Sequence, residues 1–402
     1  MSRPPLLAAL VFGGFSLLAS TALADWTFYR GPSENGISAE KLGALPMGGL
    51  RQLWKASVGT GTSSITVSGD RVFTMGNVQN KDDVWCFEAK SGRVLWKHEY
   101  PLDVDKRSFE GGTAATPTVD GNRVYTVSHQ GDLFCLDIAT GKPVWYKHYQ
   151  QNFGGKRPYY GYAASPLVEG NLLICEVGAK GASTVALDKT TGNVVWKSGD
   201  DDLGYASPIA ANILGKRTIV LFKSNQLVGL EAQTGHELWR QAWKTEYDIN
   251  AATPLVDGNR IFVTSGYGSG CALFEITASG VSEHWRNKNL RSHINSPVLW
   301  QGAIFGIDNT ASPRSPLVCL DLETGAIKWS QKLGGGALML ADGKLVILSE
   351  PGELIIGEAS SAGFQPALRQ HVLPSRCWVQ PTVANGRVFC RNNTGEMVAL
   401  SF

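Results

Sequence analysis

The side chains best suited to chemistry precede a series of short apolar segments that begin with small residues. They comprise acids, amides, tyrosines, a histidine, an arginine and a tryptophan: Glu110, Tyr162, Tyr205, Asp248, Asn250, His293, Asn295, Arg376 and Trp378. Aromatic faces combined with polar groups fit a flat ligand or a peptide. The carboxylates and amides, Glu110, Asp248, Asn250 and Asn295, could also bind a hard cation such as calcium if the fold brought them together.

Each of these features also has a plainer interpretation. The same segments could cap a channel and hydrogen-bond one another or water. A loop histidine such as His293 more often makes structural hydrogen bonds than acts as a base. No CxxC or Cys/His cluster has metal-ligand spacing, so we predict no metal site of that type. The glycine-rich segments 59–62 and 266–270 open no helix, which argues against a phosphate cradle.

A repeat separates these segments and must position them. Its frame is an acid, a glycine four residues later and a tryptophan four residues after that. The frame occurs five times: Glu88-Gly92-Trp96, Asp137-Gly141-Trp145, Asp188-Gly192-Trp196, Glu231-Gly235-Trp239 and Asp321-Gly325-Trp329. Such regular spacing indicates a repeat architecture.

Each repeat reads as four strands. A Ser or Thr before proline opens it, and a Gly-Asn or Asp-Gly type of turn joins two alternating apolar runs, as in residues 116–125. A third strand ends at the acid, and a fourth carries the tryptophan. Four antiparallel strands make one blade of a propeller.

Eight openings give eight blades: Ser64, Thr116, Ser165, Ser207, Thr253, Ser296, a position near Gly336, and Gln380. The docking tryptophans of the fourth strands are Trp54, Trp96, Trp145, Trp196, Trp239, Trp285 and Trp329, and the degenerate seventh repeat offers only Leu368. Trp54 lies before the first full repeat, whereas the eighth repeat ends before a fourth strand. We therefore predict an all-β, eight-bladed propeller of four-stranded antiparallel blades, closed by the N-terminal strand.

The repeated residues have predicted structural roles. The tryptophan wedges between neighbouring blades, the glycine supplies a positive φ in the turn, and the acid accepts hydrogen bonds from the turn backbone. Cys86, Cys135 and Cys319 share one apolar strand position, which indicates small buried thiols. Of the seven cysteines, Cys377 and Cys390 are the one pair whose spacing suggests a bridge.

The N-terminus has the pattern of an export signal. Arg3 precedes the apolar run 6–18, and residues 22–24 form a small-x-small cleavage site. We predict a signal peptide over 1–24 with cleavage after Ala24, an extended arm over 25–51 and a single propeller over 52–402. The mature protein is then periplasmic or secreted, without a transmembrane segment. The net charge of +2, without a basic run, gives no reason to expect nucleic acid as a partner.

The acid, glycine and tryptophan frame at blade spacing resembles the tryptophan-docking repeat of pyrroloquinoline quinone (PQQ)-like eight-bladed propellers. The resemblance covers essentially residues 52–402. The superfamily includes quinoprotein alcohol dehydrogenases and non-catalytic relatives such as the outer-membrane assembly lipoprotein. Residues 26–38 resemble the start of exported PQQ-like repeat proteins of bacteria.

Two departures qualify what the resemblance implies. The dehydrogenases usually carry adjacent cysteines and longer insertions that roof the quinone, and this chain has no Cys-Cys pair. The assembly lipoprotein carries a lipid-attachment cysteine, which is absent near residue 24. We therefore expect a non-catalytic, monomeric scaffold that binds a protein or peptide in the cell envelope and needs no cofactor. The alternative is an oxidoreductase of the alcohol dehydrogenase type that depends on PQQ and calcium.

Overall fold

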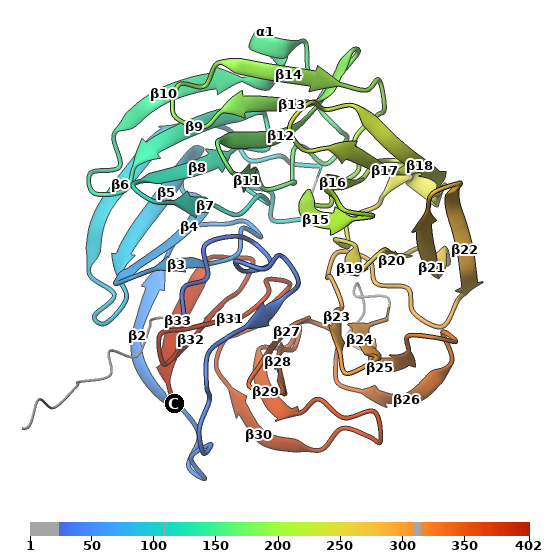
Figure 1. Cartoon of the computed structure of the whole chain (residues 1–402). Helices are drawn as coiled ribbons and strands as arrows, with labels where there is room; N and C mark the ends of the chain where they lie inside the picture. Colours follow the sequence, from blue (N-terminus) through green and yellow to red (C-terminus); the bar gives the residue numbers. More distant parts are fainter. Residues whose placement is uncertain (1–23, 108, 309–314) are drawn as a thin grey trace, which may run out of the picture.

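The computed structural model describes residues 24–107, 109–308 and 315–402. Over these ranges the chain forms eight antiparallel sheets arranged as blades around a central channel (Figure 1). The predicted signal peptide falls outside the described residues except for Ala24. Within the described ranges, no helix is long and apolar enough to cross a membrane.

The first four blades follow one another along the chain. Blade 1 contains β3 (Thr66–Ser68), β4 (Arg71–Asn77), β5 (Lys81–Glu88) and β6 (Val94–Pro101). Blade 2 contains β7 (Thr118–Asp120), β8 (Arg123–Val127), β9 (Asp132–Asp137) and β10 (Pro143–His148), followed by α1 (Tyr149–Phe153). Blade 3 contains β11 (Leu167–Glu169), β12 (Leu172–Ala179), β13 (Ala182–Asp188) and β14 (Val194–Ser198). Blade 4 contains β15 (Ile209–Ile213), β16 (Lys216–Phe222), β17 (Gln226–Glu231) and β18 (Glu237–Ala242), followed by the short helix η1 (Glu246–Asp248).

The remaining blades complete the ring. Blade 5 contains β19 (Leu255–Asp257), β20 (Arg260–Ser265), β21 (Gly270–Thr277) and β22 (Gly280–Asn287). Blade 6 contains β23 (Val298–Trp300), β24 (Ala303–Ile307), β25 (Pro316–Asp321) and β26 (Ile327–Lys332). Blade 7 contains β27 (Ala337–Ala341), β28 (Lys344–Leu348), β29 (Glu353–Glu358) and β30 (Pro366–His371), with β1 (Ile37–Ser38) added to its channel edge. Blade 8 contains β31 (Thr382–Ala384), β32 (Arg387–Arg391), β33 (Glu396–Ser401) and the N-terminal strand β2 (Arg51–Ser57).

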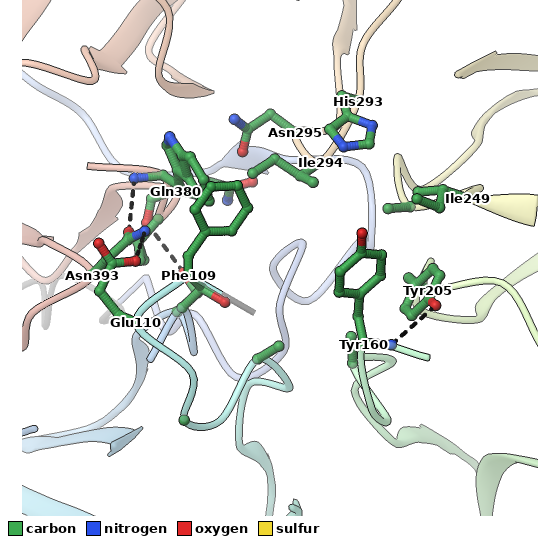
Figure 2. Close-up of a pocket in the computed structure, with 18 of the residues that line it drawn as sticks. Phe109, Glu110, Tyr160, Tyr205, Ile249, His293, Ile294, Asn295, Gln380 and Asn393 are labelled. Carbon is green, nitrogen blue, oxygen red and sulfur yellow. Dashed lines mark hydrogen bonds between the residues drawn. The ribbon is translucent and has the colours of Figure 1, made fainter. Parts of the chain in front are cut away.

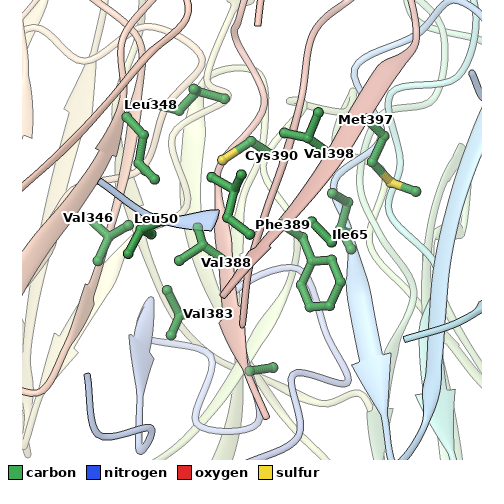
Figure 3. Close-up of a cluster of buried hydrophobic side chains, with 14 of the residues drawn as sticks. Leu50, Ile65, Val346, Leu348, Val383, Val388, Phe389, Cys390, Met397 and Val398 are labelled. Atoms are coloured by element: carbon green, nitrogen blue, oxygen red, sulfur yellow. The ribbon is translucent and has the colours of Figure 1, made fainter. Parts of the chain in front are cut away.

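The predicted fold and ring closure are confirmed. Strand β2 pairs antiparallel with β33, so the two ends of the propeller share blade 8. Apolar side chains from β28, from β31 to β33 and from Leu50 pack together around this closure (Figure 3). The fully buried Arg391 guanidinium donates to the backbone oxygens of Gly59, Gly61, Ser63 and Met75, and so ties blade 8 to the start of blade 1.

The tryptophans dock neighbouring blades as predicted. Each indole Nε1 donates to a carbonyl in the β-turn of the next blade: Trp54 to Ala89, Trp96 to Ile138, Trp145 to Lys189, Trp196 to Ala232, Trp285 to Leu322 and Trp329 to Ser360, at 2.8–3.2 Å. Trp239 is the exception, because its buried Nε1 has no partner within the described ranges. The facing turn of blade 5, residues 277–280, lacks the acid and glycine frame.

The turn glycine has a second role besides supplying the predicted positive φ. Gly141 has φ +70, and a Cβ at this position would lie 2.5 Å from the indole of Trp96 in the preceding blade. The acid of the frame behaves as predicted, since the Asp137 carboxylate accepts from the N–H groups of Ala139 and Thr140. The glycine therefore both permits the turn and makes room for the neighbouring tryptophan.

The strand residue opposite each tryptophan explains the repeated cysteines. Cys86, Cys135 and Cys319 pair directly with Trp96, Trp145 and Trp329, respectively. In blade 7 two aliphatic side chains of equal size replace this small–large pair, because Ile356 lies opposite Leu368. All seven cysteines are buried free thiols, so the suggested bridge between Cys377 and Cys390 does not form.

The Ser and Thr residues that open the repeats form a belt around the channel. The backbone N–H of one opening donates to the hydroxyl of the next: Ser64 to Thr116, Thr116 to Ser165, Ser165 to Ser207, and Thr253 to Ser296, at 2.8–2.9 Å. This hydrogen-bonding role explains why a small hydroxyl residue recurs at the start of the innermost strands.

The N-terminal arm crosses one end of the channel (Figure 1). We call this end, where turns join the first and second strands of each blade, the lower end. Trp26 pairs with Val67 of blade 1, and β1 pairs in parallel with β27 of blade 7. Between them, the buried Arg30 guanidinium donates to the carbonyls of Ser296 and Pro297. The arm therefore contacts blades 1, 6 and 7.

Candidate functional site

A wide cavity opens at the other end of the channel, which we call the upper mouth. It contains about 1280 Å³ of empty space, part of it open to solvent. Its walls come from the segments that precede the innermost strands and from the turns between second and third strands. Tyr29 of the N-terminal arm and the hydroxyl residues Ser64, Ser165 and Ser207 also line it.

One wall contains Phe109, Glu110 and Asn393 (Figure 2), and the Arg376 guanidinium supports it. The Arg376 guanidinium lies 5.1 Å from the Phe109 ring centroid and 5.0 Å from that of Trp378, and these two rings meet edge to face at 4.6 Å. Arg376 Nη1 also donates to Glu110 Oε1 at 2.9 Å, while Asn393 Nδ2 lies 3.3 Å from Glu110 Oε2. The Glu110 carboxylate is therefore held by an ion pair and an amide.

The opposite wall is a row of aromatic side chains (Figure 2). Tyr160 lies beside Tyr205, with ring centroids 6.0 Å apart. Tyr267 packs edge to face on both Tyr247, at 5.2 Å, and His293, at 4.7 Å. Each ring contacts a neighbour, so the row presents aromatic surface in fixed orientations.

His293 is a neutral side chain in this wall. Burial lowers its pKa to about 4, because the charged imidazolium would lose solvation. Its Nδ1 has no hydrogen-bond partner among the described residues. With so low a pKa, and without an orienting carboxylate, it is a weak general base at neutral pH.

A second carboxylate at the mouth, that of Asp105, is also paired with arginine. Asp105 accepts hydrogen bonds from Arg107, at 3.0 Å from Nε, and from Arg157. Burial alone would raise the pKa of Asp105, but the hydrogen bonds from both arginines outweigh it and hold the pKa well below its usual range. Both carboxylates that line the cavity, Asp105 and Glu110, are thus paired with arginine.

The structure brings five of the nine predicted site residues to the cavity wall: Glu110, Tyr205, His293, Asn295 and Trp378. Arg376 does not line the cavity but supports it through Glu110 and Trp378. The other three predicted residues do not line it. Tyr162 is buried and donates to the Val177 carbonyl, and Asp248 is exposed outside the lining. Asn250 is fully buried and caps the carbonyls of Lys223 and Ser224.

Several lining residues were missed by the sequence analysis. Phe109 directly precedes the predicted Glu110, and Tyr160 lies two residues before the predicted Tyr162. Tyr267 and Asn393 lie in turns between second and third strands. Tyr29 comes from the arm, and Gln380 was identified only as a repeat opening. Including the turns between second and third strands would have found Tyr267 and Asn393, because those turns end at the same end of the channel.

Five exposed aromatic residues surround the mouth, and we call them the aromatic collar. They are Phe109, Tyr159, Tyr160, Tyr247 and Tyr267, with exposed fractions of 70%, 61%, 36%, 68% and 47%. The Arg107 guanidinium lies 5.3 Å from the Tyr159 ring centroid. Such a concentration of exposed rings at one place marks an interaction surface.

The lining of the mouth combines apolar and polar groups. It offers aromatic faces, hydroxyls, amides and arginine-paired carboxylates. Among residues 24–107, 109–308 and 315–402, no group of three His, Cys, Asp or Glu side chains could hold a metal ion.

Solved structures confirm the architecture. BamB from Moraxella catarrhalis matches with a TM-score of 0.67 and 17% identity, covering 88% of this chain and 100% of that one. Quinohemoprotein alcohol dehydrogenase ADHIIG from Pseudomonas putida HK5 matches with a TM-score of 0.61 and 12% identity, covering 94% of this chain and 80% of that one. At such identities the likeness shows the fold alone. No curated protein matches the sequence.

A family model also matches the sequence itself. It is described as outer membrane protein assembly factor BamB and spans residues 80–331, well over half of the chain. This range runs from the third strand of blade 1 to the fourth strand of blade 6. The chain therefore belongs to the outer membrane protein assembly factor BamB family.

Proposed function

We propose that this protein is an exported, non-catalytic scaffold of the cell envelope that binds a protein or peptide partner at its upper mouth. The aromatic collar is the observation that carries the proposal. Phe109 and Tyr247 are about two-thirds exposed or more, although each contacts another ring. Exposed apolar surface of this kind is stabilised when a partner covers it.

The composition of the collar favours a protein partner. Tyrosine, tryptophan, phenylalanine and arginine are enriched in the energetically important centres of protein interfaces. Tyr160, Tyr267 and Trp378 are already held by ring contacts. Binding therefore immobilises few additional rotatable side-chain bonds, and the entropic cost of binding is small.

The comparisons support the envelope location. The matching family is described as an outer membrane protein assembly factor, and the matched Moraxella structure is a BamB. Export rests on the sequence pattern of residues 1–24. The family description and the export pattern both support a location in the cell envelope.

The residues of the mouth do not fit the calcium that the PQQ-dependent alternative requires. Calcium takes six to eight oxygen ligands, with carboxylates prominent among them. Glu110 is paired with Arg376, Asp248 lies outside the lining, and the Oδ1 of Asn250 accepts from the Ser265 hydroxyl. We therefore do not propose quinone-dependent oxidation at this mouth.

Affinity capture from envelope extracts tests the proposal. The Phe109→Ala/Tyr247→Ala variant should lose a specific partner, with recovery lower by at least about 10-fold, as expected for loss of interface hot spots. The control is Val144→Ala/Val195→Ala, which removes two exposed apolar side chains from the outer strands β10 and β14. Equal recovery by both variants would refute a role for the collar.

Reconstitution addresses the alternative. Purified protein incubated with PQQ and calcium should show no tight quinone binding and no dye-linked alcohol oxidation. Stoichiometric binding with turnover would overturn the non-catalytic assignment.

A further inference from the structure

A second cavity lies at the lower end of the channel, apart from the upper mouth. The arm residues Ser33, Glu34, Asn35 and Ile37 form one side of it. Strand β15 forms another side, and Leu255, Val256 and Leu299 of blades 5 and 6 supply apolar surface. The space is about 820 Å³, part of it open to solvent.

Strand β15 presents an open edge to this cavity. The Ala210 N–H turns away from β16 and donates to Glu34 Oε2. Because N–H directions alternate along a strand, the Asn212 N–H also faces the channel and takes no part in the β15–β16 ladder. Ala210 and Ala211 are half-buried and Asn212 is exposed, so a ligand could reach this edge.

Another blade shows what such an edge can bind. Among the eight innermost strands, β15 and β27 have five residues, whereas the other six have three. The channel edge of β27 is already covered by β1, with Ile37 opposite Leu340 and the Leu340 N–H donating to the Gly36 carbonyl. The fold therefore accommodates an extra strand on an inner edge of this length.

Glu34 adds charge selectivity to the β15 edge. It lines the cavity, and none of the ion pairs formed within the described ranges involves it. The nearby Arg217 is engaged by Glu169 through two hydrogen bonds of 2.9 and 2.7 Å. The Glu34 carboxylate thus lies mostly buried beside a cavity without a cation of its own.

We propose that the open edge of β15 binds an extended peptide segment as an added strand, with a basic group of that segment beside Glu34. The ligand class is an extended, β-prone peptide that carries an amino terminus or a lysine. The Asn212 N–H and the Ala210 carbonyl supply backbone hydrogen bonds, since the Ala210 N–H already donates to Glu34. The apolar side chains of Leu255 and Leu299 receive alternate side chains. This site is independent of the partner proposed for the upper mouth.

The test uses the full mature chain and a fluorescent peptide, Lys-Val-Thr-Val-Thr-Val, with a free amino terminus. Fluorescence anisotropy should show saturable binding, and methylation of alternate peptide nitrogens should abolish it. The Asn212→Pro variant removes one channel-facing N–H while sparing the β15–β16 ladder, and should weaken binding by about 10-fold, one hydrogen bond's worth. Asn212→Ser keeps the N–H and should bind as the wild type does.

Glu34→Gln tests the charge. The wild type should prefer the lysine peptide to a matched peptide that begins with an acetylated glutamate, and the variant should lose that preference. The proposal is overturned if the wild type shows no saturable binding, or if the methylated and unmethylated peptides bind equally. Because the N-methylated peptide needs no variant, this outcome is decisive even if Asn212→Pro fails to fold.

Discussion

The two ends of the propeller differ in how far their side chains repeat from blade to blade. The lower end repeats one design, in which a turn glycine such as Gly141 makes room for the tryptophan of the preceding blade. At the upper mouth the side chains differ from blade to blade. Arg376 packs on aromatic rings at one wall, and a row of tyrosines forms the other. The repeated docking turns fix the ring, and the side chains that vary from blade to blade are free to carry binding.

This difference predicts that substitutions at the two ends affect different properties, stability at one and binding at the other. Changes in the docking turns at the lower end should reduce the free energy of unfolding, because each turn is both strained and closely packed. Changes in the aromatic collar should affect binding and leave that free energy nearly unchanged.

The largest loss is expected at a docking glycine. Gly141→Val forces a branched side chain into φ +70 and into the Trp96 indole, and should lower the free energy of unfolding by about 3 kcal/mol. Gly121→Ala is the control, since Gly121 has φ +54 but nothing within 4 Å of an added Cβ. Urea denaturation measures both. Equal losses would show that backbone strain alone matters.

The pH dependence of stability should have opposite signs at the two ends. Burial raises the pKa of Glu34 to about 7, while the Ala210 N–H lowers it in part. Between its usual pKa of 4.5 and 7, the native state holds a proton that the unfolded chain has lost, so rising pH removes stability. Relative to Glu34→Gln, the wild type should lose roughly 1–3 kcal/mol between pH 4.5 and 7.5.

His293 at the upper mouth should behave in the reverse way. Its folded pKa of about 4 lies below the ordinary 6.5, so the unfolded chain binds the proton first as pH falls. Relative to His293→Gln, the wild type should therefore lose stability from pH 6.5 down to 4. Denaturant titrations across this range measure both slopes, and slopes of the same sign would contradict the assigned burial.

A smaller difference is expected between two docking tryptophans. Trp96→Phe removes a hydrogen bond to the Ile138 carbonyl, whereas Trp239→Phe removes an indole N–H that has no partner among the described residues. The first should cost about 1 kcal/mol more than the second in thermal or urea unfolding. The contrast fails if the Trp239 variant is the less stable of the two.

The smallest change in stability is expected at the collar. Tyr247→Ser removes a ring that is 68% exposed, and should change the free energy of unfolding by less than about 0.5 kcal/mol. A loss comparable to that of Gly141→Val would mean that the collar belongs to the fold.

The contrast between the ends also explains what could be predicted from the sequence. Blade number, ring closure at Trp54 and the role of the acid follow from local spacing, and the repeat makes that spacing visible. The second role of Gly141 depends on a contact with the preceding blade, which no single repeat reveals.

The upper mouth was only partly predictable, because loop side chains follow no fixed alternation. Tyr160 faces the cavity while Tyr162, two residues later, is buried. Asn250 has the right chemistry, but its amide is used to cap nearby carbonyls. Tyr29 reaches the cavity from the arm, a distance along the chain that no repeat spacing encodes.

Photo-crosslinking in intact cells tests the central claim, that the upper mouth is the surface that binds the partner. A photoreactive residue placed at Phe109 or Tyr247 should yield a discrete protein adduct, identifiable by mass spectrometry. The same residue at Val144 or Ile327, which are also exposed but lie on outer strands, should yield none. Adducts from the outer strands without any from the collar would contradict the account.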